Sequence, residues 1–446
     1  MINTKSMNRR NFIRSSALGV GALGGAMLHS QETKQDETGA KSGAETGQAT
    51  AEPLKIKEYR TLGRTGFRVS DISAGFVANP AVLEQLLDAG VTYIDSAESY
   101  GNEAVIGSVV KNRDRKKVFI TTKLQVAKGM TKEDILNRAY KCLERLQSDY
   151  IDCMMMHSPE TIEALKFEPF HEAMDQMKRE GKLHFTGLSN HGTNWFVLPK
   201  VSMKDVLTAA AMDGRFDVML LAYNFVQDDK GAEVLELCRQ KNIGTTLMKV
   251  NPIANLPVYK KRIEEMKEKG KKVPDDWYVT VARLEAKEQK AREFIKKYNL
   301  DNAQKMRDAA IRFCLSNPNV HTICCSFNNF DQLGAFLPLS GTRLSDMEKE
   351  KLAAYKEGCA PLYCRHACGV CEPSCPHHVR VNTIMRYNHY FDAQGKEKYA
   401  MKKYAKLPVK ADLCENCKGY CESACPHGVP IHALLNMAHH NLSLNV

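Results

Sequence analysis

The fold is decided by residues 118–157, which read VFITTKLQVAKGMTKEDILNRAYKCLERLQSDYIDCMMMH. A β-rich apolar run, VFITTK, comes first. An amphipathic helical stretch, TKEDILNRAYKCLERL, separates it from a second β-rich run, YIDCMMMH. Strands buried on both faces read as nearly continuous apolar runs, and a helix between two of them is typical of a parallel βαβ unit. The stretch therefore predicts two parallel strands joined by a helix.

The same alternation continues on both sides of this unit, with further helical stretches such as KGAEVLELCRQK (230–241). Eight strand–helix units within about 280 residues fit a (β/α)8 barrel. The sequence therefore predicts an α/β fold that begins with a (β/α)8 TIM barrel over residues 56–345. The six other predicted strands are DISAGF (71–76), VTYID (91–95), HFTGLS (184–189), FDVMLLAYN (216–224), IGTTLMK (243–249) and VHTICCSF (320–327).

Polar side chains end three of the predicted strands. Asp95 ends VTYID, Lys123 ends VFITTK and His157 ends YIDCMMMH, and Tyr100 follows shortly after the first of them. Chemistry in such barrels takes place at the carboxyl ends of the strands. A tyrosine, with an ordinary pKa of about 10, donates a proton more readily when a lysine stabilises its phenolate.

Four motifs in the barrel region resemble a single family. IDSAESYGNE (94–103) is similar to the aldo/keto reductase signature. Three further stretches resemble the family's next three motifs in order: TTKL (121–124), DYIDCMMMHSP (149–159) and GKLHFTGLSN (181–190). EYRTLGRTGFRVS (58–70) also resembles the hairpin that closes the barrel floor in these enzymes. The resemblance covers roughly residues 57–340.

The resemblance implies an oxidoreductase that interconverts a carbonyl and an alcohol on a small molecule, such as a sugar derivative. It implies that Tyr100 is the acid–base group and that Lys123 modulates it. Asp95 is then the partner of Lys123, and His157 hydrogen-bonds the carbonyl oxygen and orients the substrate.

The same resemblance implies a nicotinamide cofactor, NADH or NADPH. The serine and asparagine of GLSN match residues that hold the nicotinamide carboxamide in the family, and backbone N–H groups after the last strand are expected to hold the pyrophosphate. Residues 326–341 contain no Lys or Arg to bind a 2′-phosphate, so no preference between the two nucleotides is predicted. The expected cofactor contacts are Ser189, Asn190, Met248, Ser326, Asn328 and Asn329.

Eight cysteines near the carboxyl terminus form two matching blocks. The blocks read Cys364-x3-Cys368-x2-Cys371-x3-Cys375-Pro376 and Cys414-x2-Cys417-x3-Cys421-x3-Cys425-Pro426. In ferredoxins with similar runs, three thiolates hold one four-iron cluster and the cysteine before proline holds the other. The blocks also repeat at a fixed period, which predicts two stacked copies of one unit.

Crossed binding of two 4Fe-4S clusters follows from this pattern: the first three cysteines of each block bind with the last cysteine of the other. Helical sequence follows each Cys-Pro, so residues 346–446 are predicted to form a small α-helical, ferredoxin-like dicluster domain. The resemblance here is to the aldo/keto reductase branch that carries such a module. Zinc binding and a disulfide scaffold are the alternatives.

The amino terminus resembles a signal for the Tat translocon, because NRRNFIR (8–14) precedes the short, uncharged run SSALGVGALGGAML. Residues 1–30 are therefore predicted to be a Tat signal peptide that exports the protein to the periplasm, and a basic tail is the alternative. Residues 31–55 contain no aromatic residue and almost no aliphatic one, which predicts a flexible linker. The apolar run is too short to span a bilayer, so an integral membrane protein is not expected.

The net charge of +11 is scattered along the chain, and no basic stripe interleaved with aromatic residues occurs, so nucleic acid is not an expected partner. A small carbonyl or hydroxyl substrate and a redox partner protein are expected. Free nicotinamide nucleotide is scarce outside the cytoplasm, which leaves three possibilities open. The nucleotide travels tightly bound, or the clusters supply the electrons without it, or the barrel is a non-catalytic binding or electron-transfer subunit.

Overall fold

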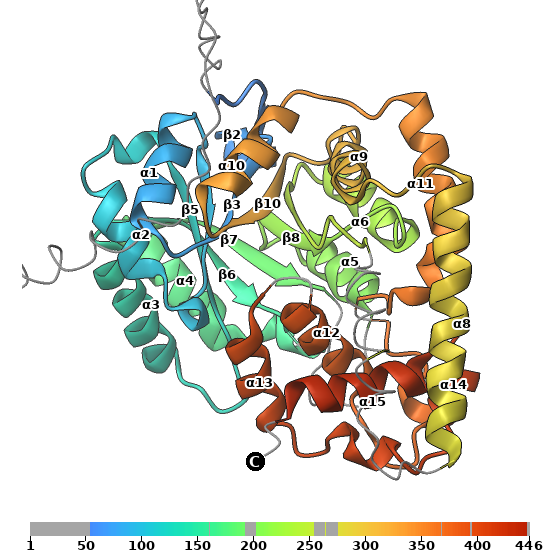
Figure 1. Ribbon diagram of the computed structural model, residues 1–446. Helices are drawn as coiled ribbons and strands as arrows, with labels where there is room; N and C mark the ends of the chain where they lie inside the picture. The colour runs from blue at the N-terminus through green and yellow to red at the C-terminus, as the bar shows by residue number, and fades with distance from the viewer. Residues whose placement is uncertain are drawn as a thin grey trace, which may run out of the picture. The chain divides into compact units, whose positions relative to one another are not determined.

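Eight parallel strands form a closed barrel, as the alternation of apolar runs predicted (Figure 1). The structure is a computed structural model that describes residues 54–159, 161–191, 202–253, 264, 275–366, 368–392 and 395–443. The predicted signal peptide and nearly all of the predicted linker lie outside these residues. The barrel strands are β3 (Ile72–Val77), β4 (Tyr93–Asp95), β5 (Phe119–Leu124), β6 (Ile151–His157), β7 (Leu183–Asn190), β8 (Val218–Ala222), β9 (Gly244–Met248) and β10 (Thr322–Phe327).

Helices between the strands cover the outside of the barrel (Figure 1). Local residues set the two ends of the helix after β5. Thr131 and Asp134 form a capping box at its start, and Gln147 ends it in the left-handed conformation. The helices are α1 (Pro80–Asp88), α2 (Glu103–Val110), α3 (Lys132–Leu146), α4 (Glu168–Arg179), α5 (Met203–Asp213), α6 (Asp229–Gln240), α9 (Ala303–Leu315) and α10 (Phe330–Phe336).

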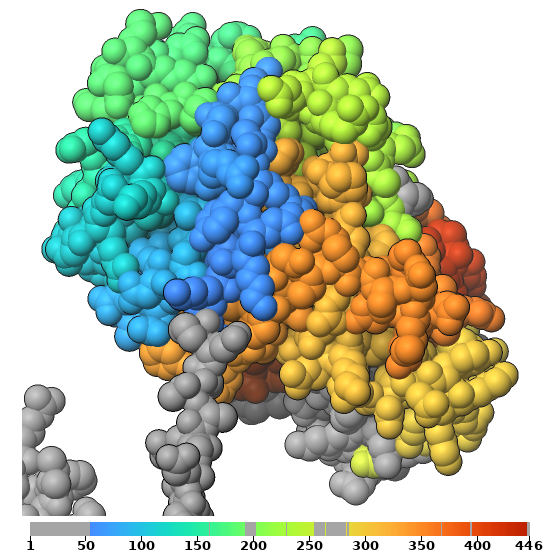
Figure 2. All heavy atoms as spheres, turned by 90° about the horizontal axis from the view of Figure 1, so that it is seen from above, coloured from blue at the N-terminus to red at the C-terminus, as the bar shows by residue number. Residues whose placement is uncertain are grey.

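The floor of the barrel is closed by the predicted hairpin, β1 (Tyr59–Thr61) and β2 (Arg68–Ser70), which pair antiparallel. Between these strands Leu62 is fully buried in a cluster with Phe119, the first residue of β5. Gly244 begins β9, and a Cβ there would lie 2.7 Å from the Leu62 side chain, so the close approach requires glycine. Figure 2 views this end of the molecule, where the first described residues run across the surface.

The interior and the outside of the barrel wall are packed by alternate side chains of the same strands. Met155 lies in the interior cluster with Tyr93 and Phe119, whereas Met154 and Met156 pack in the cluster under the helices. All three methionines are fully buried, so packing accounts for this run.

A second group of helices, one from between β9 and β10 and the others from after the barrel, shares a core with α9. The helix α8 (Asp275–Lys297) packs against α11 (Asp346–Cys359) and α15 (Ile431–Leu442). The helix α12 (Val381–Asp392) packs against α13 (Glu397–Ala405) and α15, and the short α14 (Tyr420–Ser423) precedes α15. Residues 53–446 form one compact unit, so packing continues across the domain boundary predicted at residue 345.

The two cysteine blocks are structural repeats as well as sequence repeats. The backbone N–H of Asn382 donates to Glu372 at 2.8 Å, and fifty residues on the N–H of His432 donates to Glu422 at 3.0 Å. Each bond ties the start of a helix, α12 or α15, to the short helical turn before its Cys-Pro. We call residues 360–443 the C-terminal module.

The helices of the C-terminal module lie at the carboxyl ends of the barrel strands (Figure 1). Lys249, which directly follows β9, donates to the hydroxyl of Tyr390 on α12 at 3.2 Å. Gln227, which follows β8, donates to the carbonyl of His366 at 2.8 Å. Among the described residues, no helix combines the length and the apolar character that a membrane span requires.

Candidate active site

The predicted catalytic and cofactor residues lie at one end of the barrel because all of its strands are parallel. His157, the last residue of β6, is opposite Ser189 on β7. Asn190, the last residue of β7, is opposite Leu221 on β8. The adjacent strand ends therefore place these side chains around a common opening, which we call the barrel mouth.

Lys123 and Asp95 form a buried ion pair at the barrel mouth. The Lys123 ammonium donates to the Asp95 carboxylate at 2.7 Å and also to the carbonyl of Ser96. Lys123 is 1% exposed and Asp95 is 3% exposed. Burial raises the pKa of Asp95, and the charge of Lys123 opposes that rise. The second carboxylate oxygen of Asp95 is buried without a hydrogen-bond partner among the described residues.

Tyr100 is held over this pair by a short turn of helix, Glu98–Tyr100. Gly101 ends the turn in the left-handed conformation, with φ 71°, and Asn102 then donates to the carbonyl of Val77 at 2.9 Å. The Lys123 ammonium lies 5.0 Å from the centre of the Tyr100 ring. Tyr100 remains 38% exposed, so part of this residue is open to a small molecule.

The surroundings of Tyr100 favour its protonated form. Burial, aided by the charge of Asp95, raises the pKa of Tyr100 well above its ordinary value. The group therefore carries a proton at neutral pH, which a proton donor needs, and the ammonium of Lys123 is placed to stabilise the phenolate that remains after transfer.

His157 stands next to Tyr100, with their rings edge to face and their centres 6.0 Å apart. Burial, together with the charges of Lys123 and Lys403, lowers the pKa of His157 to about 3. His157 is therefore neutral at physiological pH. Its Nδ1 atom is buried without a hydrogen-bond partner among the described residues, and a neutral imidazole of this kind can bond to a substrate oxygen without competing to protonate it.

Ser189 and Asn190 fit the nicotinamide end of a dinucleotide. The Ser189 hydroxyl is buried at the end of β7 and has no hydrogen-bond partner among the described residues. The Asn190 side chain donates to the carbonyl of Pro159 at 3.1 Å, which fixes its orientation. A serine hydroxyl and a side-chain amide supply the donors and acceptors that a carboxamide requires.

The other predicted cofactor contacts lie at the ends of β9 and β10, two and three strands along the barrel from β7. Met248 is the last residue of β9 and is half-buried, and Ser326 lies near the end of β10. Asn328 and Asn329 are exposed. Asn329 caps α10 by accepting from the backbone N–H of Gln332 at 3.1 Å, so part of the first turn expected to hold a pyrophosphate is already hydrogen-bonded.

The first cysteine set lines a single cavity between the two repeats of the C-terminal module. Its walls include the thiols of Cys364, Cys368, Cys371 and Cys425. The last of these comes from the other block. The side-chain amide of Asn382 donates to the Cys364 sulfur at 3.4 Å.

The second cysteine set is also drawn together from both blocks. Cys414, Cys417 and Cys421 interact electrostatically with one another and with Cys375. Among the described residues, no three His, Cys, Asp or Glu side chains stand where they could hold a metal ion. A four-iron cluster binds each thiolate at a separate iron, so it requires ligands that surround a space rather than converge on one point. The all-thiol donor sets fit such a cluster.

Two helices of the C-terminal module bring side chains to the barrel mouth that the sequence did not predict. Tyr390 on α12 and Tyr399 on α13 interact electrostatically with Tyr100. The Lys396 ammonium lies 4.9 Å from the centre of the Phe76 ring, which itself packs edge to face on Tyr100. Only the basic and aromatic run RYNHY, at 386–390, could have signalled these contacts in the sequence.

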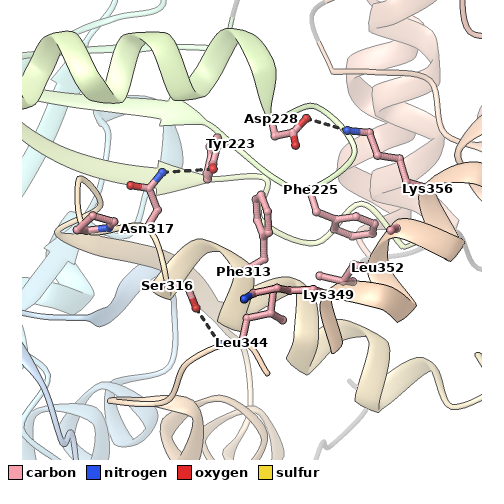
Figure 3. A pocket seen from close by; sticks show the side chains of 12 residues that line it. Tyr223, Phe225, Asp228, Phe313, Ser316, Asn317, Leu344, Lys349, Leu352 and Lys356 are labelled. Atoms are coloured by element: carbon pink, nitrogen blue, oxygen red, sulfur yellow. Dashed lines mark hydrogen bonds and ion pairs between the residues drawn. The ribbon is translucent and has the colours of Figure 1, made fainter. Parts of the chain in front are cut away.

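A separate cavity of about 520 Å³ lies outside the barrel mouth, beneath α11 (Figure 3). Phe225, Phe313 and Leu352 form its apolar wall, and the ion pair between Asp228 and Lys356, at 2.9 Å, closes one side. None of the predicted catalytic, cofactor-binding or cluster residues lines it.

Comparison with known proteins places the barrel in a family. The model of the aldo/keto reductase family matches residues 77–357. Methylglyoxal reductase DkgB of Salmonella typhi is 29% identical over 112 residues, which are 25% of this chain and 42% of the relative. An aldo-keto reductase of Mycolicibacterium smegmatis is 31% identical over 153 residues, which are 33% of this chain and 52% of the relative. This chain thus spans about half the length of the curated relatives it matches, or less.

A solved aldo-keto reductase from Bacillus halodurans, AKR11C1 in its holo form, is 20% identical to this chain. The match covers 67% of this chain and 95% of the solved chain, with a TM-score of 0.47. The match to the family model spans more than half of the sequence and includes the strand ends with Asp95, Tyr100, Lys123 and His157. The chain belongs to the aldo/keto reductase family.

Proposed function

We propose that this protein is an exported oxidoreductase that interconverts a carbonyl and an alcohol on a small molecule and carries two 4Fe-4S clusters. The observation that carries the enzymatic part is the buried pair of Lys123 and Asp95 beneath the accessible hydroxyl-bearing ring of Tyr100. A buried ion pair is costly to desolvate, so its position beneath Tyr100 favours a role in the chemistry of that residue.

In the reductive direction, Tyr100 donates a proton to the oxygen of the carbonyl group, and Lys123 stabilises the phenolate that forms. Asp95 keeps Lys123 oriented. The neutral His157 hydrogen-bonds the same oxygen and so sets the face that the carbonyl presents. A bound NADH or NADPH would supply the hydride, and Ser189 and Asn190 would hold its carboxamide.

The test is the turnover of methylglyoxal, the compound in the name of the Salmonella relative, with NADH and with NADPH. Tyr100→Phe should lower kcat by about 100-fold to 10,000-fold, because it removes the proton donor and leaves the ring in place. Tyr140→Phe is the matched control, since the Tyr140 hydroxyl bonds to Glu180 on the outside of the barrel. Full activity in Tyr100→Phe would refute the assigned chemistry.

The electron source needs a test of its own. Purified protein, first shown to be free of bound nucleotide, is titrated anaerobically with NADH and NADPH while nicotinamide fluorescence and cluster absorbance are followed together. Binding of either nucleotide supports hydride transfer. Failure of both to bind would remove nicotinamide from the proposal and leave the clusters, fed by a redox partner protein, as the source of electrons.

The cluster part of the proposal is supported by the two crossed thiol sets and by hydrogen bonds to their sulfurs. The backbone N–H of Val379 donates to the Cys375 sulfur at 3.4 Å, and that of Gly419 donates to the Cys417 sulfur at 3.5 Å. Such bonds tune the redox potential of a bound cluster. Bound clusters would supply single-electron transfer.

Iron and sulfide analysis of purified protein should give two clusters per chain, and Cys425→Ser should lose one of them. Because the pairing is crossed, Cys364→Ser should abolish the same electron paramagnetic resonance signal as Cys425→Ser. Cys359→Ser is the matched control, since its buried thiol donates to the carbonyl of Ala291 and lines neither set. Zinc in place of iron, or loss of different signals in the two variants, would overturn this assignment.

We propose export through Tat because a twin-arginine motif precedes the apolar run and because clusters must be inserted before the chain leaves the cytoplasm. Changing both Arg9 and Arg10 to Lys should keep the protein in the cytoplasm of cells whose Tat translocon is intact. Equal amounts of the variant and the wild type in the periplasm would contradict export by this route.

A further inference from the structure

A group of basic side chains lies between the strand ends and α12, beside the catalytic residues. Lys249 comes from the end of β9 and Arg386 from α12, and the two interact electrostatically. Lys249 is half-buried, and Arg386 is 5% exposed. The C-terminal module therefore places a second cation next to one that the barrel supplies.

Neither cation has a carboxylate partner among the residues that the structure describes. Within the described part of the chain, the Lys249 ammonium donates to the hydroxyl of Tyr390, and the Arg386 guanidinium donates to that of Tyr363 at 3.4 Å. The Nε atom of Arg386 is buried and has no hydrogen-bond partner among the described residues. Arg386 also interacts electrostatically with Cys364, a predicted cluster ligand. A buried cation is costly unless it is paired, so Lys249 in particular favours a partner of opposite charge from outside the described residues.

His366 provides an independent sign of a missing ligand. It is 1% exposed, and both of its ring nitrogens are buried without a hydrogen-bond partner among the described residues. The side-chain amide of Gln227 donates to the backbone carbonyl of His366 at 2.8 Å. The His366 ring packs on the ring of His191, with their centres 4.5 Å apart. The bond from Gln227 places His366 near the end of β8, the strand that pairs with β9, which Lys249 follows.

The backbone at Lys249 is strained in a way that supports a binding role. Its φ is 60°, in the left-handed region that residues other than glycine rarely adopt. Such strain persists where the surrounding structure holds a side chain in a functional position. Here the strained backbone follows β9 directly and turns the lysine towards α12.

We propose that Lys249, Arg386 and His366 form an anion-binding site for a carboxylate or phosphate group of the molecule that occupies the barrel mouth. This inference rests on the proposed function, because it adds an acidic substrate to the carbonyl chemistry assigned to Tyr100. A guanidinium binds either anion with two parallel hydrogen bonds, and the ammonium and the imidazole add further donors. Tyr390 connects the two sites, since it accepts from Lys249 and interacts with Tyr100.

The first experiment does not depend on activity. Inorganic phosphate is titrated into the cluster-loaded protein while the midpoint of thermal unfolding is followed. The wild type should be stabilised, and the dissociation constant should rise by about tenfold to a hundredfold in Lys249→Met, since one charge-assisted contact is lost. Lys249→Arg should retain binding. Lys349→Met is the control, because Lys349 is exposed and pairs with Asp346 on α11.

An unchanged response to phosphate in Lys249→Met, or no response in the wild type, would overturn the site. If Lys249→Met does not fold, Arg386→Lys replaces it: this variant keeps the charge but loses the two parallel bonds, so it should bind phosphate more weakly than the wild type. Equal binding would likewise refute the proposal. Because this experiment measures binding alone, it still decides the matter if no carbonyl substrate is turned over.

A second experiment identifies which molecule carries the anion. The wild type and Lys249→Met are compared on 4-formylbenzoate and 4-formylbenzamide, aldehydes of the same size that differ in charge. We expect KM to rise in the variant for the benzoate alone, which places the acid on the substrate. A loss of NADH or NADPH affinity with both aldehydes affected equally would assign the site to the cofactor pyrophosphate instead. Unchanged values for both aldehydes and both nucleotides would refute the proposal.

Discussion

The barrel and the C-terminal module each contribute a tyrosine to a lysine–tyrosine pair at the barrel mouth. The Lys123 ammonium lies 5.0 Å from the centre of the Tyr100 ring, and the Lys249 ammonium lies 5.1 Å from that of Tyr390. The geometries are alike, but the charges differ. Lys123 is bonded to Asp95 at 2.7 Å, whereas Lys249 has no carboxylate partner among the described residues.

The surroundings shift the pKa values of the two tyrosines in opposite directions. Burial and the charge of Asp95 raise the pKa of Tyr100. Burial also acts to raise the pKa of Tyr390, but the charges of Lys249 and Arg386 outweigh it and hold that pKa below its ordinary value. Where a carboxylate balances the lysine, as Asp95 balances Lys123, the tyrosine retains a proton that it can transfer. Where no carboxylate balances the lysine, the pair maintains a positive field. The comparison indicates that one site serves chemistry and the other serves the binding of charge.

Replacing the lysine of each pair by methionine should change the free energy of unfolding, and the larger change is expected for Lys123. Lys123→Met leaves Asp95 buried and unpaired, which should lower the free energy of unfolding by about 3–5 kcal/mol. Urea unfolding measures the loss. The double variant Lys123→Met, Asp95→Leu should regain most of that stability, because a buried pair can be exchanged for apolar groups at little cost. A double variant as unstable as the single one would show that the pair is not compensated as described.

Most of the barrel could be predicted from the sequence because its signals are local. Each buried strand is a short apolar run, and the hairpin at 58–70 and the helix at 132–146 have their own turn and cap residues. The arrangement of the C-terminal module depends instead on contacts between distant segments. The side chain of Gln227 reaches the backbone of His366, 139 residues away, and no periodicity in the sequence records that pairing.

A smaller effect should be seen in the dependence of stability on pH. Burial and the charges of Lys123 and Lys403 lower the pKa of His157 to about 3, whereas an unfolded histidine titrates near 6.5. Between these values the unfolded chain binds a proton that the folded chain does not. The free energy of unfolding should therefore fall as the pH is lowered from about 6.5 towards 3, by up to about 1.4 kcal/mol per pH unit.

His157→Gln should remove this contribution, so its stability should depend less steeply on pH than that of the wild type. Lys403→Met tests the part that comes from the C-terminal module, because it should raise the pKa of His157 when followed by nuclear magnetic resonance. Equal slopes in the wild type and His157→Gln would mean that folding does not lower the pKa of His157.

The candidate site was predictable to the extent that it lies on single strands. Asp95, Lys123 and His157 end three strands, so the rule for parallel barrels sufficed to bring them together. Tyr390 and Arg386 could not be assigned to the barrel mouth, because their place depends on how α12 packs. The sequence shows them only as a basic and aromatic stretch after a Cys-Pro.

The smallest expected change in stability, that of Lys249→Met, most directly distinguishes the Lys249–Tyr390 pair from the Lys123–Tyr100 pair. Lys249→Met removes a cation that no carboxylate in the described part of the chain neutralises. It should therefore raise the free energy of unfolding by about 1 kcal/mol, as is common where a site sacrifices stability for function. The sign is opposite to that for Lys123→Met, and urea unfolding of both variants in phosphate-free buffer measures it. Lys249→Arg keeps the charge and should leave stability near that of the wild type. A loss in Lys249→Met as large as that in Lys123→Met would mean that the phenolate of Tyr390 already compensates Lys249, and the positive field at the barrel mouth would then be closed to an external anion.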